Sequence, residues 1–392
     1  MMQKHIDQDK FSGFNLMVAR NGRIVLDEQL GFRDVEAALP MTPDTLFRIY
    51  SMTKPVVCTA LMMLFEEGGF RMLDPLSKFI PAFGAVKVLE SDGAGGNKLV
   101  DPIRPIQIHD LFTHMAGLTY SFLEDSPVCE MYRGLPLLAD AGTSLERAID
   151  ELARLPLAYQ PGSRWHYSVS IDVIGHMIQV LSGHPLRDFL RKRMFEPLGM
   201  RDTDFFVPPA KRDRVAAMYG GPDIAAPGMT NSQIIAAGLE GYNKRADVSA
   251  SYPVDDEHFA RGGHGLFSTA ADYMRFAQML LNGGTLDGAR VLGRKTVEFM
   301  HINHIPKELL PFGASGETTP GYGFGLGSRV LMDVGMTSAP GSNGEYGWGG
   351  AATTYYWVDP EEELIGVMMA QYMTSPHMPD RTFQTAVYQA LV

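Results

Sequence analysis

Strand pairs stand near both ends of this chain, and they constrain its fold more than any other feature. Residues 14–19 alternate as a β-strand does, an Asn-Gly pair then signals a hairpin turn, and residues 24–30 form the expected returning strand. Near the C-terminus, residues 352–358 are rich in Thr, Tyr and Trp, and residues 364–370 are continuously apolar. Strands at both ends with helical material between them predict an antiparallel sheet assembled from the two termini.

The middle of the chain is expected to be helical. Apolar residues recur there at helical spacing, and Gly-Pro breaks separate the segments. The predicted helices cover residues 108–112, 145–155, 171–182, 186–195 and 268–282, and a closing amphipathic helix covers 381–392. Residues 220–253 are rich in Gly and Ala, which predicts a long irregular loop. Together with residues 120–138, this loop is expected to shape the rim of a pocket.

The charge balance bears on what the chain binds. Its 392 residues carry a net charge of −11 and no basic block, which argues against nucleic acid or an anionic membrane as a partner. No apolar run approaches the length of a membrane span, and the polar N-terminus lacks the apolar core of a secretory signal. We therefore expect a cytoplasmic soluble protein, although a processed form without its leader would show the same pattern. The sequence does not indicate an oligomeric state.

The two cysteines, Cys58 and Cys129, are too few for a disulfide framework. Neither has the Cys-x-x-Cys or Cys/His spacing of a metal site, so no structural zinc is expected. Cys58 lies within an apolar run, which predicts that it is buried.

The stretch Ser51-Met52-Thr53-Lys54 places a hydroxyl and an amine one helical turn apart. The residues that follow are apolar and open with Pro55, which fits the first turn of a buried helix. An apolar wall favours the neutral amine, which a general base for serine requires. A serine at a helix N-terminus also lies where a developing oxyanion is stabilised. A capping serine beside a snorkelling lysine would give the same pattern.

A second segment that can carry chemistry follows a Pro-Gly turn and reads Trp165-His166-Tyr167-Ser168-Val169. A tyrosine on a loop beside a lysine-paired serine can relay a proton to or from the leaving group. The alternative is that these aromatic residues only pack.

The third segment contains Trp348-Gly349-Gly350 and opens the C-terminal strand pair. Glycines at a strand edge permit the close approach of another backbone or a ligand. A backbone N–H at this edge can supply the second donor of an oxyanion hole, the first being the N–H of Ser51. A plain Gly-rich turn with a packing tryptophan is the alternative.

The histidines are scattered and include no His-Glu-x-x-His pattern, so no metal site is expected. His264 lies in a Gly-rich stretch and is the histidine expected to touch substrate, whereas His114 is expected to be structural. A Ser-His-Asp triad that uses one of the histidines stays open as an alternative to the Ser51–Lys54 pair.

These three motifs, Ser51-x-x-Lys54, Tyr167-Ser168-Val169 and Trp348-Gly349-Gly350, together resemble the active-site motifs of the class C β-lactamase-like serine hydrolases. The Trp-Gly-Gly version is most similar to the family VIII carboxylesterases. Further agreement with the family comes from residues 44–49, 109–118, 195–200 and 262–269. The resemblance therefore covers nearly the whole chain.

The resemblance implies an α/β (α+β) fold of the β-lactamase/penicillin-binding-protein type, with an antiparallel sheet flanked by helices plus a mostly helical domain. The expected division is an α/β domain of residues 1–70 and 260–392 and a helical domain of residues 71–259, with the active site at their interface. It implies no cofactor and no metal.

The same resemblance implies roles for individual residues. Ser51 would be the nucleophile, Lys54 and Tyr167 would transfer protons, and the N–H groups of Ser51 and Ala351 would form the oxyanion hole. Which of Lys54 and Tyr167 acts as the base stays open. Trp348, Gly349, Gly350 and His264 complete the expected substrate-binding set.

Two departures from the family pattern bear on the substrate. Trp348 stands where a β-lactamase or D-Ala-D-Ala peptidase of this type carries a cation that binds the substrate carboxylate. Val169 stands where the second motif usually has Asn. An apolar, aromatic pocket suits neutral esters better, so a serine carboxylesterase acting on short-to-medium acyl esters is predicted. The alternatives are a β-lactamase or D-amino-acid peptidase, an acyltransferase, or a catalytically inactive binding or interaction protein.

Overall fold

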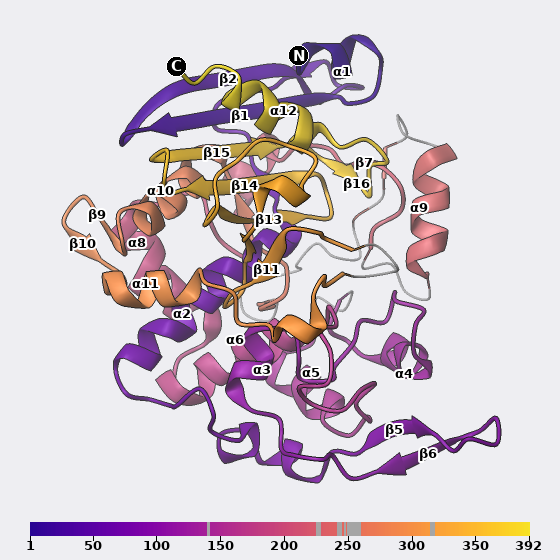
Figure 1. Ribbon diagram of the computed structural model, residues 1–392. Helices are drawn as coiled ribbons and strands as arrows, with labels where there is room; N and C mark the ends of the chain where they lie inside the picture. Colours follow the sequence, from indigo (N-terminus) through magenta and orange to yellow (C-terminus); the bar gives the residue numbers. More distant parts are fainter. Residues whose placement is uncertain (139–141, 225–228, 241–244, 247, 249–259, 314–317) are drawn as a thin grey trace.

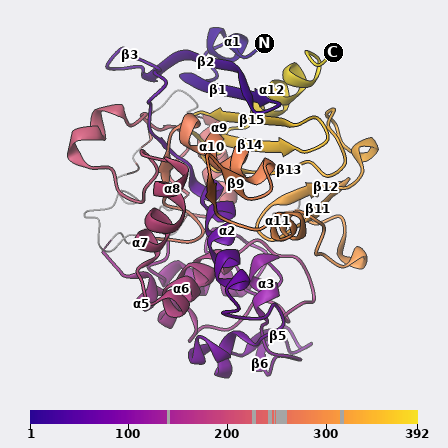
Figure 2. The same ribbon diagram turned by 90° about the vertical axis from the view of Figure 1, so that its left-hand side faces the viewer.

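The structure is a computed structural model, and it describes the chain except residues 139–141, 225–228, 241–244, 247, 249–259 and 314–317. Both termini lie near β2, toward one edge of a large sheet, and helices α3 (Ile108–Phe112), α5 (Leu145–Leu152) and α6 (Ser170–Ser182) lie on the opposite side of the molecule (Figure 1). Figures 1 and 2 both place helix α2 between the sheet and this helical group.

The large sheet has eight strands in the order β11-β12-β13-β14-β15-β1-β2-β3, and every neighbouring pair is antiparallel. Strands from the two ends of the chain meet in its middle, where β1 pairs with β15 and Met17 lies opposite Val367. The prediction of an antiparallel sheet built from both termini is therefore confirmed. Its strands are β1 Gly13–Arg20, β2 Arg23–Asp34, β3 Leu39–Pro40, β11 Tyr322–Phe324, β12 Arg329–Leu331, β13 Tyr346–Gly350, β14 Thr354–Asp359 and β15 Leu364–Met369.

Alternation along β1 directs its side chains to the two faces of the sheet, and both faces are buried at this strand. Leu16 and Val18 of β1 join an apolar cluster that includes Phe383 of helix α12, whereas Met17 and Ala19 face the main core with α2 and α10. The sheet thus lies between the terminal helices on one side and the two long buried helices on the other.

The helices outside the sheet are mostly short. Helix α2 is buried along nearly its whole length and packs against α6, which explains why its sequence is apolar on all sides. The α-helices are α1 Gln3–Asp7, α2 Thr53–Glu66, α3 Ile108–Phe112, α4 Pro127–Met131, α5 Leu145–Leu152, α6 Ser170–Ser182, α7 Leu186–Leu190, α8 Glu196–Leu198, α9 Asn231–Glu240, α10 Ala270–Leu281, α11 Arg294–Met300 and α12 Pro379–Tyr388. None of the helices in the described part of the chain is long and apolar enough to cross a bilayer.

The described residues also form four two-stranded ribbons: β4 Phe47–Arg48 with β8 Phe267–Ser268, β5 Val88–Ser91 with β6 Asn97–Val100, β7 Tyr219–Gly220 with β16 Tyr372–Met373, and β9 Thr285–Leu286 with β10 Ala289–Arg290. The β4–β8 ribbon matters for the site, because the Ile49 N–H donates to the Leu266 carbonyl directly beyond it at 3.0 Å. This pairing holds the chain before Ser51 against the Gly-rich stretch that ends at Leu266.

Two predictions about secondary structure need correction. The stretch 220–253 is not irregular throughout, because it contains α9. Thr230 and Gln233 form a capping box before this helix, and Ile234 is fully buried in the main core. Residues 225–228, 241–244, 247 and 249–253 of the predicted loop lie outside the described residues. The predicted helix 186–195 is also not a uniform α-helix, since α7 passes into a π-helical turn, η5 Arg191–Phe195.

The helical elements α3 to α8 come from residues 108–198, and the strands of the large sheet come from residues 13–40 and 322–369. Assignment of these regions to two domains with the bounds given above stays a prediction.

Candidate active site

The Ser51 hydroxyl lies between an amine and a phenol. Ser51 belongs to a 3₁₀ turn, Tyr50–Met52, that leads directly into α2. The Lys54 Nζ donates to the Ser51 Oγ at 3.0 Å, and the Tyr167 hydroxyl donates to the same oxygen at 2.7 Å. Helical spacing explains the first contact, whereas Tyr167 is 116 residues away from Ser51 in the sequence. The structure thus brings together the three residues predicted to carry the chemistry.

The Lys54 side chain is buried, with 1% of its surface exposed. Its Nζ also donates to the carbonyl oxygen of Gly263 at 2.6 Å. It lies 4.7 Å from the ring centre of Tyr167 and 5.4 Å from that of Tyr120. One N–H is thus fixed on a backbone acceptor while the amine faces the serine oxygen. This is the arrangement in which a neutral amine can accept the serine proton.

Backbone hydrogen bonds hold the segment that carries Tyr167. The His166 N–H donates to the His114 carbonyl at 2.8 Å, and the Val169 N–H donates to the Thr119 carbonyl at 3.2 Å. Tyr167 therefore lies between two anchored residues just before α6 begins. This explains how a residue outside any helix or strand is held at hydrogen-bond distance from Ser51.

Trp348 contributes an aromatic wall beside this tyrosine. It belongs to β13, a separate strand that pairs with β14, rather than to a turn that opens β14. The indole centre lies 5.8 Å from the Tyr167 ring centre and 5.3 Å from that of Phe324 in β11. The wall is apolar on the side where the sequence predicts that substrate binds.

The end of β13 lies against the turn that carries Ser51. A Cβ atom added to Gly350 would stand 2.3 Å from the Ile49 carbonyl oxygen, so only glycine fits this close approach. Ala351 follows and packs in the same apolar cluster as Tyr50. The backbone of Ala351 therefore lies beside the residue preceding Ser51. Its role as an oxyanion donor, like that of Gly349 in substrate binding, stays a prediction.

Tyr50, the residue directly before Ser51, has a strained backbone. Tyr50 has a φ of +41°, a region that bulky side chains rarely adopt. Its ring is buried, and its hydroxyl donates to Asp223 at 3.2 Å. Packing and this hydrogen bond hold a backbone turn that would otherwise relax, and the turn presents Ser51 at the start of α2.

Burial disfavours the charged form of the two histidines near the site, His264 and His114. Burial, with help from Arg261 and Lys54, lowers the pKa of His264 to about 3, and burial lowers the pKa of His114 well below its ordinary value. The His264 Nε2 lies 3.3 Å from the Leu138 carbonyl oxygen, and the expected contact of His264 with substrate stays a prediction. In the described part of the chain, no histidine hydrogen-bonds to Ser51, so the geometry gives the Ser-His-Asp alternative no support.

Two buried polar side chains beside Lys54 were missed by sequence reasoning. Tyr120 lies with its ring centre 5.2 Å from that of Tyr167, and Asp172 in the first turn of α6 accepts a hydrogen bond from the Gly263 N–H at 2.9 Å. The sequence signal for Asp172 is indistinguishable from an ordinary acidic residue at a helix start. Only its burial and its partner show that it belongs to this site.

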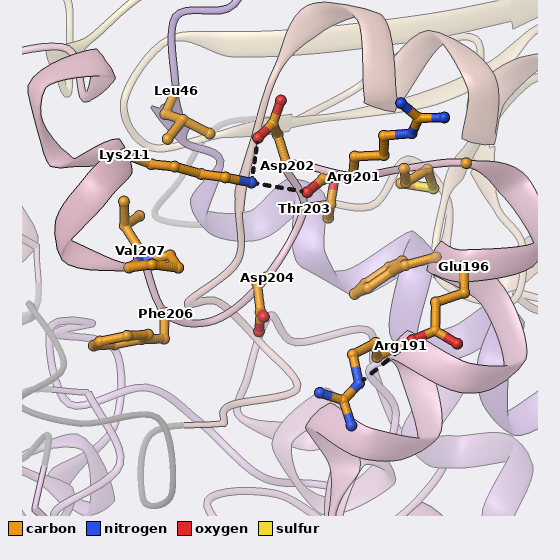
Figure 3. A pocket seen from close by; sticks show the side chains of 14 residues that line it. Leu46, Arg191, Glu196, Arg201, Asp202, Thr203, Asp204, Phe206, Val207 and Lys211 are labelled. Carbon is orange, nitrogen blue, oxygen red and sulfur yellow. Dashed lines mark hydrogen bonds and ion pairs between the residues drawn. The ribbon is translucent and has the colours of Figure 1, made fainter.

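Figure 3 shows a different cavity of about 480 Å³, which none of Ser51, Lys54 and Tyr167 lines. Most of its charged side chains are paired: Lys211 contacts Asp202 at 2.7 Å, and Arg191 contacts Glu196 at 3.8 Å. The lining therefore offers no cluster of unpaired like charges to attract an ionic ligand. We assign it no catalytic role.

Comparison with known proteins gives one family. The sequence model of the beta-lactamase family matches residues 1–390 of the chain. Protein Rv1367c of Mycobacterium tuberculosis (strain ATCC 25618 / H37Rv) is 35% identical over 386 residues, which cover 97% of this chain and 89% of that protein. Esterase EstB of Burkholderia gladioli is 30% identical over 347 residues, which cover 88% and 81%.

A solved structure agrees with this result. EstCE1, a hydrolase with promiscuous acyltransferase activity, has a TM-score of 0.81 against this chain and is 26% identical to it. The match covers 99% of this chain and 96% of EstCE1. The prediction of a β-lactamase-type fold with an antiparallel sheet is confirmed.

Proposed function

The chain belongs to the beta-lactamase family and is a serine hydrolase, and we propose that it is a carboxylesterase that cleaves short-to-medium acyl esters through an acyl-enzyme on Ser51. One observation carries the proposal: the Ser51 Oγ lies 3.0 Å from the buried Lys54 Nζ and 2.7 Å from the Tyr167 hydroxyl. A serine becomes a nucleophile when a neighbouring group takes its proton, and these two side chains are the groups in position to do so.

The proposed reaction has two steps. The Ser51 oxygen attacks the ester carbonyl and its proton passes to Lys54 or Tyr167, while the N–H groups of Ser51 and Ala351 bind the developing oxyanion. The tetrahedral intermediate collapses, and the alcohol leaves with that proton. A water molecule then gives a proton to the same base, attacks the acyl-enzyme and releases the carboxylic acid, which restores Ser51.

The aromatic wall supports an ester as the substrate. Trp348 occupies the place where the resemblance implies a cation in β-lactamases and D-Ala-D-Ala peptidases, and its ring packs against Tyr167. A carboxylate bound here would lose hydration without gaining a charged partner. A neutral ester has no such cost. The names of the relatives EstB and EstCE1 point in the same direction.

The decisive test compares two substrates on one purified protein. We expect turnover of p-nitrophenyl butyrate well above that of nitrocefin, and loss of ester turnover in Ser51→Ala by roughly 10³-fold or more. Ser91→Ala, on the exposed β5–β6 hairpin, is the matched control and should keep full activity. Faster nitrocefin turnover would instead identify a lactamase or peptidase.

Two further experiments separate the proposed esterase from an acyltransferase and from an inactive binding protein. An acyltransferase would give more ester product than free acid when an alcohol acceptor is added, whereas we expect water to remain the main acceptor. An inactive binding protein would not react with a fluorophosphonate probe, whereas we expect covalent labelling that Ser51→Ala abolishes.

A further inference from the structure

A carboxyl group is buried beside the catalytic lysine without serving as its ion-pair partner. Asp172, the third residue of α6, is fully buried. Its Oδ1 accepts the Gly263 N–H at 2.9 Å, and its Oδ2 has no hydrogen-bond partner within the described part of the chain. Burying a carboxyl with one unpartnered oxygen is costly, so a structural role alone would favour an apolar or amide side chain.

The glycines facing this carboxyl show how closely the two segments approach. A Cβ atom added to Gly262 would stand 1.9 Å from the Ile171 carbonyl oxygen. One added to Gly263 would stand 2.5 Å from the Asp172 Oδ2 and 3.0 Å from the Tyr120 hydroxyl oxygen. Any other residue would push this loop away from α6. The Gly-Gly pair therefore lets the Gly263 peptide lie directly on Asp172.

The same glycine contacts the catalytic lysine with its carbonyl group. The Gly263 N–H is held by Asp172, and the Gly263 carbonyl accepts from the Lys54 Nζ at 2.6 Å. The Lys54 Nζ in turn contacts the Ser51 Oγ at 3.0 Å. We propose that Asp172 is a positioning residue, which holds Gly263 so that its carbonyl orients the Lys54 amine toward Ser51.

A lysine needs such orientation because its amine rotates freely at the end of a flexible stem. With one N–H fixed on the Gly263 carbonyl, fewer rotations of the amine are available, and the lone pair of the neutral form can face the serine. Groups that orient metal ligands in this way are worth about 10- to 100-fold in affinity or activity, and we expect an effect of similar size for the orientation of Lys54. Asp172 acts through Gly263 and does not touch the substrate.

Three ionisable groups face Asp172: Lys54 from α2, Arg261 from the Gly-rich loop, and Tyr120 from the segment after α3. Burial raises the pKa of Asp172, while the Gly263 N–H and the Lys54 charge oppose this rise. When ionised, Asp172 adds negative charge near Lys54 and so favours the ammonium form. A neutral replacement should therefore extend activity toward lower pH.

The test uses two variants of Asp172 and one matched control site. Asp172→Asn keeps an oxygen that can accept the Gly263 N–H, whereas Asp172→Leu has a similar shape and no acceptor. The control is Asp272, which is also the third residue of its helix, is also buried, and accepts hydrogen bonds from the Asp202 N–H and the Thr203 hydroxyl at 2.7 and 2.9 Å. Asp272→Leu therefore reproduces the structural loss without affecting the Lys54 contact.

The readouts are the rate of fluorophosphonate labelling of Ser51, kcat and KM for p-nitrophenyl butyrate, and the melting temperature. We expect Asp172→Leu to lower the labelling rate and kcat by about 10- to 100-fold with little change in KM, and Asp172→Asn to recover most of this loss. The acid limb of the Asp172→Asn profile should move to lower pH. Asp272→Leu should lower the melting temperature and leave the labelling rate within about threefold of wild type.

The proposal would be overturned if Asp172→Leu labelled at the wild-type rate. It would also be overturned if Asp272→Leu lost as much labelling rate as Asp172→Leu does. If Asp172→Leu does not fold, Asp172→Asn decides, because an acid limb that stays where it is in the wild type contradicts the proposal. This inference rests on the proposed function, but the two fail differently. Failure of the proposed function appears as a wild-type protein that neither labels nor turns over ester.

Discussion

The hydroxyl of Tyr167 and that of Ser51 share a hydrogen bond of 2.7 Å in which the phenol is the donor. Lys54 points its amine at the same serine oxygen from another side. The serine oxygen thus faces two proton-bearing groups, and it can lose its own proton only to a lone pair on one of them. Either the amine must be neutral or the phenol must be ionised before attack. The two possibilities give different consequences for mutation.

Replacing Lys54 by Met keeps a long, flexible side chain and removes the amine. We expect ester turnover to fall by about 10²- to 10⁴-fold, the range for loss of a general base, and the rate of fluorophosphonate labelling to fall with it. The melting temperature should hold or rise, because a buried amine is replaced by an apolar group. Lys78→Met is the control, since Lys78 is exposed and its ion pair is with Asp74, on the surface. Unchanged labelling in Lys54→Met would exclude Lys54 as the base.

Replacing Tyr167 by Phe removes one hydroxyl and keeps the ring that packs between Trp165 and Trp348. Turnover is expected to fall by about 10²- to 10⁴-fold with little change in melting temperature, because the loss is a proton-transfer group rather than packing. Steady-state assays and thermal unfolding measure the two effects separately. Tyr159→Phe loses only a hydroxyl that donates to the Asp125 carbonyl, so it should retain activity.

Tyr167→Phe also indicates which group is the base. Comparable losses of acylation and deacylation would favour a role for Tyr167 in both steps. Retained burst labelling with slow release of the acid would confine Tyr167 to the second step and leave Lys54 as the acylation base.

Several elements of the fold can be predicted from short stretches of the sequence. The alternation of residues 14–30 and the Asn-Gly turn predict β1 and β2, which the structure confirms, and the apolar run after Pro55 predicts α2. Helix α9 was missed because its Gly- and Ala-rich sequence has a weak periodicity, and its evident signals are the Thr230–Gln233 capping box and one fully buried Ile234. Whether a weak helix forms depends on the core that receives it.

The candidate site also combines contacts that the local sequence predicts with contacts that it does not predict. Ser51 and Lys54 are a helical turn apart, so their contact follows from local geometry. The contact of Tyr167 with Ser51 cannot be predicted from spacing, and it was expected only because the three motifs occur together in the order of the family. Asp172 and Gly263 are separated by 91 residues, and neither belongs to a recognisable motif with the other. Such a pair can be found only after the fold brings α6 and the Gly-rich loop together.

Trp348 offers a test of substrate choice. In Trp348→Lys a cation would stand beside Tyr167, in the place where the resemblance implies one for lactamases. We expect the ratio of nitrocefin to p-nitrophenyl butyrate turnover to rise by about 10- to 150-fold, since one charge-assisted contact is worth roughly 1.5–3 kcal/mol. Trp348→Phe should keep the wild-type ratio because it preserves an apolar ring. An unchanged ratio in Trp348→Lys would show that this residue does not set the preference.

A buried carboxyl away from the site should make the stability of the protein depend on pH. Glu345 is buried against α12, where Gln384 and the Tyr388 hydroxyl donate to its Oε2 at 2.7 and 3.0 Å. Burial raises the pKa of Glu345 from 4.5 to about 7, and Asp359 also acts to raise it. The folded protein therefore binds a proton more tightly than the unfolded chain does. Its stability should decrease as pH rises from about 4.5 to 7, and the full penalty should be present above that range.

Glu345→Gln removes this titration while keeping an oxygen that accepts from Gln384 and Tyr388. A shift of this size corresponds to about 3 kcal/mol, so the variant should gain up to that amount in free energy of unfolding at pH 8 relative to its gain at pH 4. Urea denaturation at both pH values measures the difference. Glu362→Gln is the control, because Glu362 is half-exposed and pairs with Arg20 on the surface, where the change should stay below about 1 kcal/mol. A Glu345→Gln protein with the same pH slope as wild type would show that this carboxyl is already ionised without cost in the fold.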